Sequence, residues 1–226
     1  MGAPRTRDTA DLETDADTRA AVTQIRREID YIEATVLRTA GRAYPRGYLE
    51  ALATMSYVVG HVSAPAYGYM ASRDEPLPGF LGPPLVESTL SKGAGVCGHA
   101  SQTMLALLAH LGVRGRLSLI YFSTPTAAQN SHAAVEVFYN SRWHLFDPTW
   151  GRFYRRPKSK PWQILSAHAV LAMSPEERAV SAVYHQTLLW TQVVSQSRSV
   201  SVETGFAVFD LPHVRLDVDG KTVYSR

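Results

Sequence analysis

Cysteine is nearly absent from this chain, which has a single one, Cys97, among 226 residues. One cysteine cannot form an internal disulfide, so the sequence does not point to an oxidising compartment. Long apolar runs are also missing and residues 1–20 are polar, so we expect no membrane span, no secretory signal and a cytoplasmic location. The formal net charge is only +3, too mild to argue for a nucleic-acid partner.

Two kinds of cofactor site are missing as well. No pair of histidines or cysteines has the spacing of metal ligands, so we expect no metal site. The stretch Gly93–Gly98 matches the Gly-x-Gly-x-x-Gly pattern of dinucleotide-binding folds, which needs an acidic residue about 20 positions later. No Asp or Glu lies between Glu87 and Glu136. The sequence therefore predicts that the protein works without a cofactor.

The residues that are present predict one α+β domain behind a short tail. Residues 1–17 are acidic and contain almost nothing apolar, so we expect a disordered tail followed by a single domain over 18–226. Apolar residues recur at helical spacing as far as Gly41, and a second helix is expected to begin near Pro45. Residues 62–92 are rich in proline and glycine and are expected to form a long loop.

A central helix and three strands follow. The helix is expected over Cys97–Leu111 and has no charged residue, so it should be buried nearly all round, with Gly112 just past its end. Short apolar segments at 117–122, 133–139 and 143–146 are predicted to be strands. We therefore expect N-terminal helices and a cysteine-bearing helix packed on a mostly antiparallel sheet.

The last third of the chain carries three further signals. Residues 152–160 are basic and are expected to form a solvated loop that could meet an acidic partner, such as a carrier protein. Residues 174–177 have the pattern of a capping box with proline at the first helical position, and the helix they start is expected to reach about Trp190. Asp219-Gly220 lies between two alternating segments and predicts a hairpin.

Three residues could act together as a thiol site. A thiol becomes a nucleophile when its pKa falls, and the start of a helix and a nearby imidazole both lower it, so Cys97 is the candidate nucleophile. If Asn140-Ser141 is a two-residue hairpin loop, Ala134 lies opposite Asp147, and His132 becomes a diagonal neighbour of Asp147 on the same face. An imidazole and a carboxylate can meet across that separation, whereas a three-residue turn would change the register.

The stretch 93–151 resembles the core of the transglutaminase-like superfamily. The resemblance rests on Gly95-Val96-Cys97 opening a helix, His132-Ala133 opening a strand and Phe146-Asp147-Pro148-Thr149-Trp150-Gly151 closing the next strand. It implies a layout similar to papain-like enzymes, with Cys97 as the nucleophile, His132 as the base and Asp147 as the residue that orients the imidazole. Many members place Trp two residues after the histidine, whereas this chain has Ala134, which bears on the surface beside His132.

The resemblance implies acyl transfer through a thioester on Cys97. Water as the acceptor gives hydrolysis, an amine gives an amide and a carbanion gives a ring. We expect biosynthetic transfer or Dieckmann-type cyclisation of a small-molecule or carrier-protein-tethered acyl thioester, as in antibiotic assembly. The alternatives are an intracellular cysteine peptidase or amidase and a binding module that has lost activity. Backbone N–H groups at the start of the Cys97 helix could hold an oxyanion, with Tyr57, Tyr67 or Tyr69 as possible side-chain donors.

Overall fold

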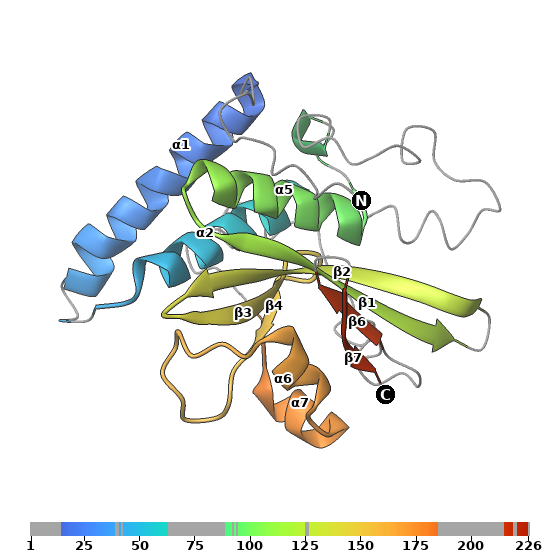
Figure 1. Ribbon diagram of the computed structural model, residues 1–226. Coiled ribbons are helices and arrows are strands. Elements are labelled where there is room, and N and C mark those ends of the chain that lie inside the picture. The colour runs from blue at the N-terminus through green and yellow to red at the C-terminus, as the bar shows by residue number, and fades with distance from the viewer. Residues whose placement is uncertain are drawn as a thin grey trace, which may run out of the picture.

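The protein is organised around one antiparallel sheet with helices on both faces (Figure 1). The computed structural model describes residues 15–38, 41, 43–62, 89–91, 93, 95–124, 127–184, 215–218 and 221–225. Within these ranges the strands pair in the order β5 (Ala182–Tyr184), β4 (Arg152–Tyr154), β3 (Arg142–Asp147), β2 (Ala127–Tyr139), β1 (Gly115–Thr124), β6 (Arg215–Val218) and β7 (Lys221–Ser225). Each pairing between neighbouring strands is antiparallel, which confirms the predicted α+β architecture.

The hairpin formed by β2 (Ala127–Tyr139) and β3 (Arg142–Asp147) has the predicted register. Tyr139 pairs with Arg142 and Val135 with Phe146, so the loop between the strands has two residues. Asn140 and Ser141 both have positive φ, at 47° and 60°. Two left-handed residues match the twist of a two-residue hairpin, and the loop length fixes which side chains share a face.

Two N-terminal helices cover one face of the sheet. α1 (Ala16–Tyr31) begins where the Asp15 carboxylate accepts hydrogen bonds from the backbone N–H of Thr18 at 2.8 Å and from its hydroxyl at 2.6 Å. The helix therefore starts two residues earlier than expected, and residues 1–14 of the predicted tail lie outside the described residues. It continues as a π-helical turn, η2 (Ile32–Leu37), and α2 (Arg46–His61) follows Pro45 as predicted.

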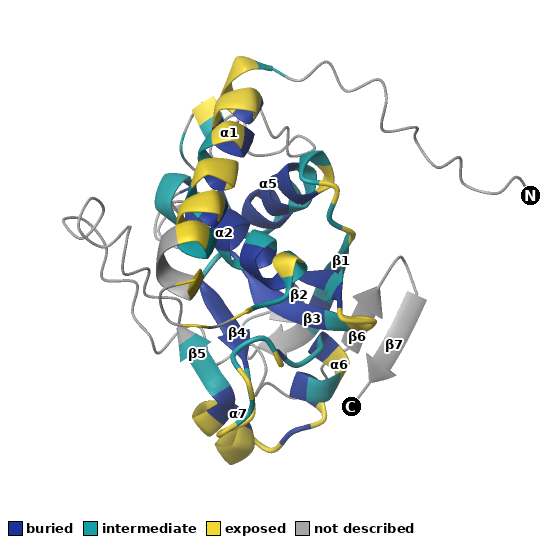
Figure 2. Cartoon of the chain, turned by 90° about the vertical axis from the view of Figure 1, so that its left-hand side faces the viewer, coloured by how far each residue is buried: buried dark blue, intermediate teal, exposed yellow. Residues whose placement is uncertain are grey.

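The apolar stripe of α1 faces inward, whereas its exposed residues lie on the outer side (Figure 2). Ile25 and Ile29 are 1% and 0% exposed. They belong to one core cluster with residues of α2, of α5 (Cys97–His110) and of the sheet, among them Met55, Leu107 and Val135. The predicted loop 62–92 lies largely outside the described residues, which include a single helical turn at 89–91.

The cysteine-bearing helix α5 (Cys97–His110) is packed between the N-terminal helices and the sheet. Met104, Leu107 and Leu108 are fully buried, as its uncharged sequence predicts. At its end Gly112 has φ +77°, and the N–H of Val113 donates to the carbonyl of Leu108 at 2.9 Å. This is the C-terminal cap expected of a left-handed glycine, and it turns the chain directly into β1 (Gly115–Thr124).

The opposite face of the sheet has its own small core. Ile120, Ala134, Leu145 and Tyr154 pack there against α6 (Ala167–Leu171). Here one prediction is wrong: residues 152–154 are not part of a solvated loop but form the buried strand β4 (Arg152–Tyr154). The reason is pairing, because Asp147 and Phe146 of β3 lie opposite Arg152 and Phe153.

The helix at the predicted capping box is shorter than expected. In α7 (Pro175–Ser181) the Ser174 hydroxyl accepts from the N–H of Glu177 at 3.2 Å, and the Glu177 carboxylate accepts from the N–H of Ser174 at 2.9 Å. The helix ends at Ser181 rather than near Trp190, because the chain enters β5 (Ala182–Tyr184), which pairs with β4. Sheet pairing thus overrides the helical pattern.

The chain closes with a hairpin beside β1. β6 (Arg215–Val218) and β7 (Lys221–Ser225) pair with each other, with Val218 opposite Lys221, so these two strands form the predicted hairpin. The predicted turn residues, Asp219 and Gly220, lie outside the described residues. Among the described residues, none of the helices is long and apolar enough to cross a membrane.

Candidate active site

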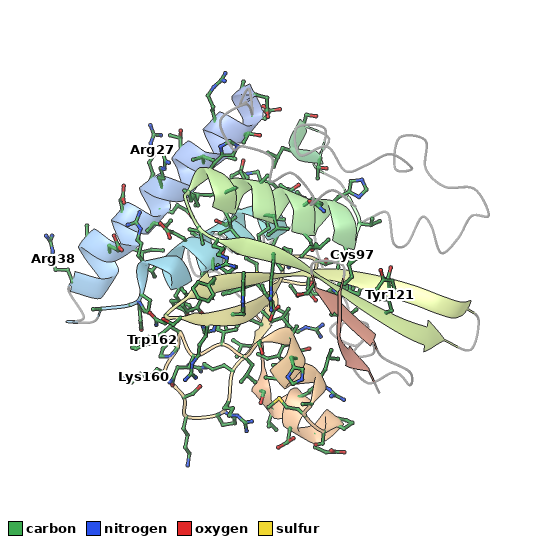
Figure 3. All side chains as sticks on the ribbon, viewed as in Figure 1. Arg27, Arg38, Cys97, Tyr121, Lys160 and Trp162 are labelled. Atoms are coloured by element: carbon green, nitrogen blue, oxygen red, sulfur yellow. The ribbon has the colours of Figure 1, made fainter. Side chains whose placement is uncertain are left out.

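Cys97 is the first residue of α5 and is partly buried (Figure 3). The preceding residue, Val96, is extended, with φ −104° and ψ −177°, and its N–H donates to Nδ1 of His99 at 3.4 Å. His99 therefore caps the helix that carries Cys97. The first turn of this 14-residue helix has backbone N–H groups without intrahelical partners, and these point toward the N-terminal end of the helix, where Cys97 lies.

The backbone before Cys97 makes a close approach that only glycine permits. A Cβ atom at Gly95 would lie 2.5 Å from Cβ of His99 and 3.4 Å from a methyl group of Val62. Gly93 has φ +60°, a conformation that favours glycine. The two glycines thus allow the chain to turn tightly into α5.

His132 and Asp147 meet as the hairpin register predicts. Nε2 of His132 lies 2.9 Å from Oδ2 of Asp147, and the two residues are 3% and 0% exposed. His132 also forms a hydrogen bond with Cys97. Because Nε2 contacts the carboxylate, Nδ1 is the ring nitrogen available to the thiol. The structure therefore brings the three candidate residues together in the order Cys97, His132, Asp147.

The charges of the three groups depend on one another. Burial alone would lower the pKa of His132, but the negative charge of Asp147, the hydrogen bond to it and the contact with Cys97 raise it to about 10. Burial would raise the pKa of Asp147, but the charge of His132 and the hydrogen bond to it outweigh burial and lower that pKa. At neutral pH the imidazole is therefore protonated and the carboxylate ionised.

Arg152 is a member of this cluster that the sequence analysis missed. It is 1% exposed, and its Nη2 lies 3.4 Å from Oδ2 of Asp147. Its guanidinium also lies over the ring of Tyr154, 5.3 Å from the centroid. The available signal was the short connection after Asp147: the turn 148–151, closed by Gly151 at φ +62°, places Arg152 directly opposite Asp147.

Two neighbours complete the surroundings of the His132–Asp147 pair. The N–H of Thr149 donates to Oδ1 of Asp147 at 3.1 Å, so both carboxylate oxygens have partners. Trp150 lies edge-on to the His132 ring, with centroids 5.1 Å apart and an interplanar angle of 79°. The Asp-Pro-Thr-Trp turn therefore supplies the carboxylate, one of its donors and an aromatic cover for the imidazole.

Other residues considered from the sequence lie elsewhere. Ala134 is fully buried in the core against α6, so its small size bears on packing rather than on a substrate surface. Tyr57 is 7% exposed and stacked on His61, and burial together with the charge of Asp17 raises its pKa. Tyr67 and Tyr69 lie outside the described residues.

Comparison with known proteins identifies the family of the chain. The model of the transglutaminase-like superfamily matches residues 34–148, about half of the chain, and the match contains Cys97, His132 and Asp147. A search of curated proteins finds no match.

Two solved structures are similar to part of the chain. One is a crystal structure of a TGase, with a TM-score of 0.40 and 16% identity, covering 62% of this chain and 35% of that one. The other, from Cytophaga hutchinsonii, is provisionally described as a cysteine protease; its TM-score is 0.35 at 17% identity, covering 61% of this chain and 44% of that one. The region shared with this chain therefore spans less than half of the length of each of the two solved proteins. From the family match over residues 34–148, the chain belongs to the transglutaminase-like superfamily.

Proposed function

We propose that the protein is an enzyme that transfers acyl groups through a thioester on Cys97. The observation that carries the proposal is the buried contact of 2.9 Å between His132 and Asp147, with His132 also hydrogen bonded to Cys97 at the start of α5. The superfamily consists in general of cysteine-based enzymes, and this chain has each group that such chemistry needs.

The charges favour a resting ion pair. A protonated His132 beside Cys97 stabilises the thiolate, and the N-terminal end of α5 does the same. With Asp147 ionised and Arg152 positive, the four side chains then alternate in sign along one row. Such an arrangement limits the cost of burying charge, because each group has a neighbour of opposite sign.

The reaction follows from this ion pair. The Cys97 sulfur attacks the acyl carbonyl carbon, a carbon–sulfur bond forms, and the carbonyl electrons move to the oxygen, where N–H groups at the start of α5 can stabilise them. The carbon–leaving-group bond then breaks, and the leaving group takes the proton from His132. In the second half His132 removes a proton from the acceptor, which attacks the thioester and releases the thiolate. Asp147 keeps the ring oriented throughout.

For the acyl donor we propose a small-molecule or carrier-protein-tethered thioester, used in biosynthetic amide formation or Dieckmann-type cyclisation. Burial supports transfer over hydrolysis, since His132 and Asp147 are 3% and 0% exposed and Trp150 covers the imidazole. The proposal includes a cytoplasmic location, which fractionation of the source cells would test. Hydrolysis of a peptide or amide by the same triad is the competing outcome.

Acyl-enzyme trapping tests the proposal. The full chain is incubated with an acyl N-acetylcysteamine thioester and, separately, with a peptide anilide, and intact mass is recorded. We expect the mass of one acyl group on the wild type and none on Cys97→Ala, with release by an added amine faster than release by water. Absence of an adduct from either donor would contradict the enzymatic role. An adduct formed only from the anilide and released by water would assign the protein as a peptidase or amidase.

A further inference from the structure

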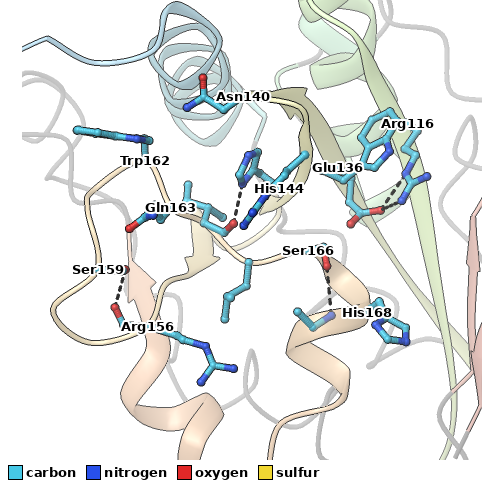
Figure 4. A pocket seen from close by; sticks show the side chains of 15 residues that line it. Arg116, Glu136, Asn140, His144, Arg156, Ser159, Trp162, Gln163, Ser166 and His168 are labelled. Atoms are coloured by element: carbon cyan, nitrogen blue, oxygen red, sulfur yellow. Dashed lines mark hydrogen bonds and ion pairs between the residues drawn. The ribbon is translucent and has the colours of Figure 1, made fainter.

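A hollow lies on the face of the sheet opposite α5. It has a volume of about 770 Å³ and is bounded by Arg142–His144 of β3, by side chains of the segment 156–169 and by Arg116 and Glu136 (Figure 4). Neither Cys97 nor the His132–Asp147 pair lines it. A volume of this size is typical of clefts that bind small molecules.

The lining carries an excess of positive charge. Three arginines, Arg116, Arg142 and Arg156, face a single carboxylate, Glu136. Glu136 is only 1% exposed, and both of its carboxylate oxygens accept hydrogen bonds. Its Oε2 accepts from Arg116 Nη2 at 2.7 Å, and its Oε1 accepts from the N–H of Ala167 at 2.9 Å. The hollow therefore presents little negative charge to a ligand.

Two of the arginines remain available. Arg142 and Arg156 are exposed, and among the residues that the structure describes neither forms an ion pair. The rim beside them is also basic, because residues 155–160 contain four cationic side chains and no acidic one. Lys158 at the tip has φ +63°, a conformation that favours glycine, and the turn is closed by a hydrogen bond from Ser159 N–H to Arg156 O at 3.2 Å. A positive charge thus stands where the backbone would prefer glycine.

The wall formed by residues 162–165 is fixed to the sheet before any ligand binds. A ring nitrogen of His144 lies 2.6 Å from the carbonyl oxygen of Ile164, and the N–H of Leu145 donates to the carbonyl of Leu165 at 2.8 Å. The hydroxyl of Tyr139 donates to the carbonyl of Trp162 at 3.0 Å. A preformed wall lowers the entropic cost of binding.

An indole ring completes the site. Trp162 lines the hollow and is held edge-on by Tyr44, with ring centroids 5.3 Å apart. Guanidinium groups bind phosphate through paired N–H donors, and an indole provides a planar surface for an aromatic ring. These two kinds of group stand here on one hollow.

We propose that this hollow binds a small ligand that combines phosphate groups with an aromatic ring, as a nucleoside diphosphate does. Arg142 and Arg156 contact the phosphates and Trp162 contacts the ring. The hollow does not include Cys97, His132 or Asp147, so the proposal of ligand binding does not depend on the proposed acyl transfer. The long, exposed arginine side chains can adjust to the phosphates, whereas the wall keeps the ring in place.

Calorimetric titration with ADP tests the proposal on the full chain. We expect one ADP per chain, with affinity about tenfold weaker in Arg142→Gln and in Arg156→Gln, because each loses a charge-assisted contact with phosphate. Arg27→Gln is the matched control: it removes an exposed arginine of α1, on the other face of the sheet and well away from Trp162 (Figure 3), and should bind ADP like the wild type. All three positions are exposed, so folding is expected to be retained, and thermal unfolding checks this.

Partial ligands separate the two kinds of contact. Pyrophosphate and adenosine should each bind more weakly than ADP. The proposal is overturned if ADP fails to saturate at about 5 mM, or if both arginine variants bind it like the wild type. Pyrophosphate binding as tightly as ADP would remove the role assigned to Trp162. Saturable binding of a poly-glutamate peptide without binding of ADP would instead identify an acidic protein segment as the ligand.

Discussion

Two histidines on neighbouring strands have pKa values that their surroundings shift in opposite directions. His132 on β2 and His144 on β3 are both buried, at 3% and 4% exposure. Burial lowers the pKa of each, but His132 faces the carboxylate of Asp147 and its pKa rises to about 10. His144 has only the carbonyl groups of Ile164 and Tyr139 beside its ring nitrogens, and its pKa falls.

The comparison separates a chemical from a structural histidine. A carbonyl dipole does not compensate the loss of hydration of an imidazolium, whereas a full negative charge does. His132 therefore carries a proton at neutral pH next to the thiol. His144 stays neutral, stacks on Tyr139 with centroids 3.7 Å apart, and joins the sheet to the segment that follows β4. Burial alone would have assigned both histidines the same role.

The largest predicted effect comes from replacing each histidine in turn. His132→Ala should lower kcat/KM for acyl transfer by roughly 10³-fold, because the proton donor and acceptor is lost. His144→Ala should leave kcat/KM within about threefold but lower the free energy of unfolding by about 1–3 kcal/mol, since a buried carbonyl loses the one N–H donor of the neutral imidazole. Steady-state kinetics and urea denaturation measure the two quantities. Equal losses of kcat/KM in the two variants would abolish the distinction.

The second prediction concerns Arg152. Arg152→Met should lower the free energy of unfolding by about 3–5 kcal/mol, because Asp147 loses a buried positive neighbour. Iodoacetamide should also alkylate Cys97 more slowly than in the wild type below pH 7. The reason is that the thiolate is stabilised by the positive charges of His132 and Arg152, and the variant has lost the second. Arg152→Lys is the matched variant and should restore part of both. Unchanged alkylation in Arg152→Met would limit this arginine to packing.

The third prediction is a pair of opposite pH slopes. The folded pKa of His132 is raised from 6.5 to about 10, so its contribution to stability is complete below pH 6.5 and is lost as pH rises toward 10. In that window stability should fall by up to about 1.4 kcal/mol per pH unit in the wild type and less in His132→Gln. The folded pKa of His144 is lowered from 6.5, so it should destabilise the protein as pH falls below that value. Urea denaturation from pH 5 to 10 would reveal both slopes, and identical curves for wild type and His132→Gln would refute the first.

The smallest effects come from the aromatic ring beside each histidine. Trp150→Leu should lower kcat/KM by about three- to tenfold with little change in stability, because the edge-on ring orients and covers His132. Tyr139→Phe should leave kcat/KM unchanged and cost about 1 kcal/mol of stability, through the lost hydrogen bond to the Trp162 carbonyl. Should both substitutions act on stability alone, Trp150 would be a packing residue.

The contact between His132 and Asp147 was predictable because local signals fix it. A two-residue loop at Asn140-Ser141 sets the register, and strand alternation then places both side chains on one face. The start of α5 was predictable in the same way, from glycines followed by an uncharged apolar segment. Where the pattern and the partner lie within one hairpin or one helix, sequence reasoning is sufficient.

The predictions that were wrong depend on strand pairing between separate segments of the chain, which local sequence patterns do not reveal. Arg152 suggested a solvated loop because arginine is rarely buried, and only its position opposite Asp147 explains its burial. The helix expected to reach Trp190 stops at Ser181 because Val183 pairs with Phe153. The hollow beside Trp162 could not be foreseen, since it is assembled from three strands and a later segment.

The two-residue turn at Asn140-Ser141 has a consequence for how this chain can change its length. Both turn residues are left-handed, and the turn alone sets which residue of β3 lies across from β2. A single inserted residue there would move Asp147 to the other face of the sheet, away from His132. Insertions between residues 156 and 160 shift no strand of the site. In a library of single-residue insertions, an insertion at Asn140-Ser141 should abolish activity, whereas an insertion between residues 156 and 160 should be tolerated. The length of this one loop therefore determines whether His132 and Asp147 can meet.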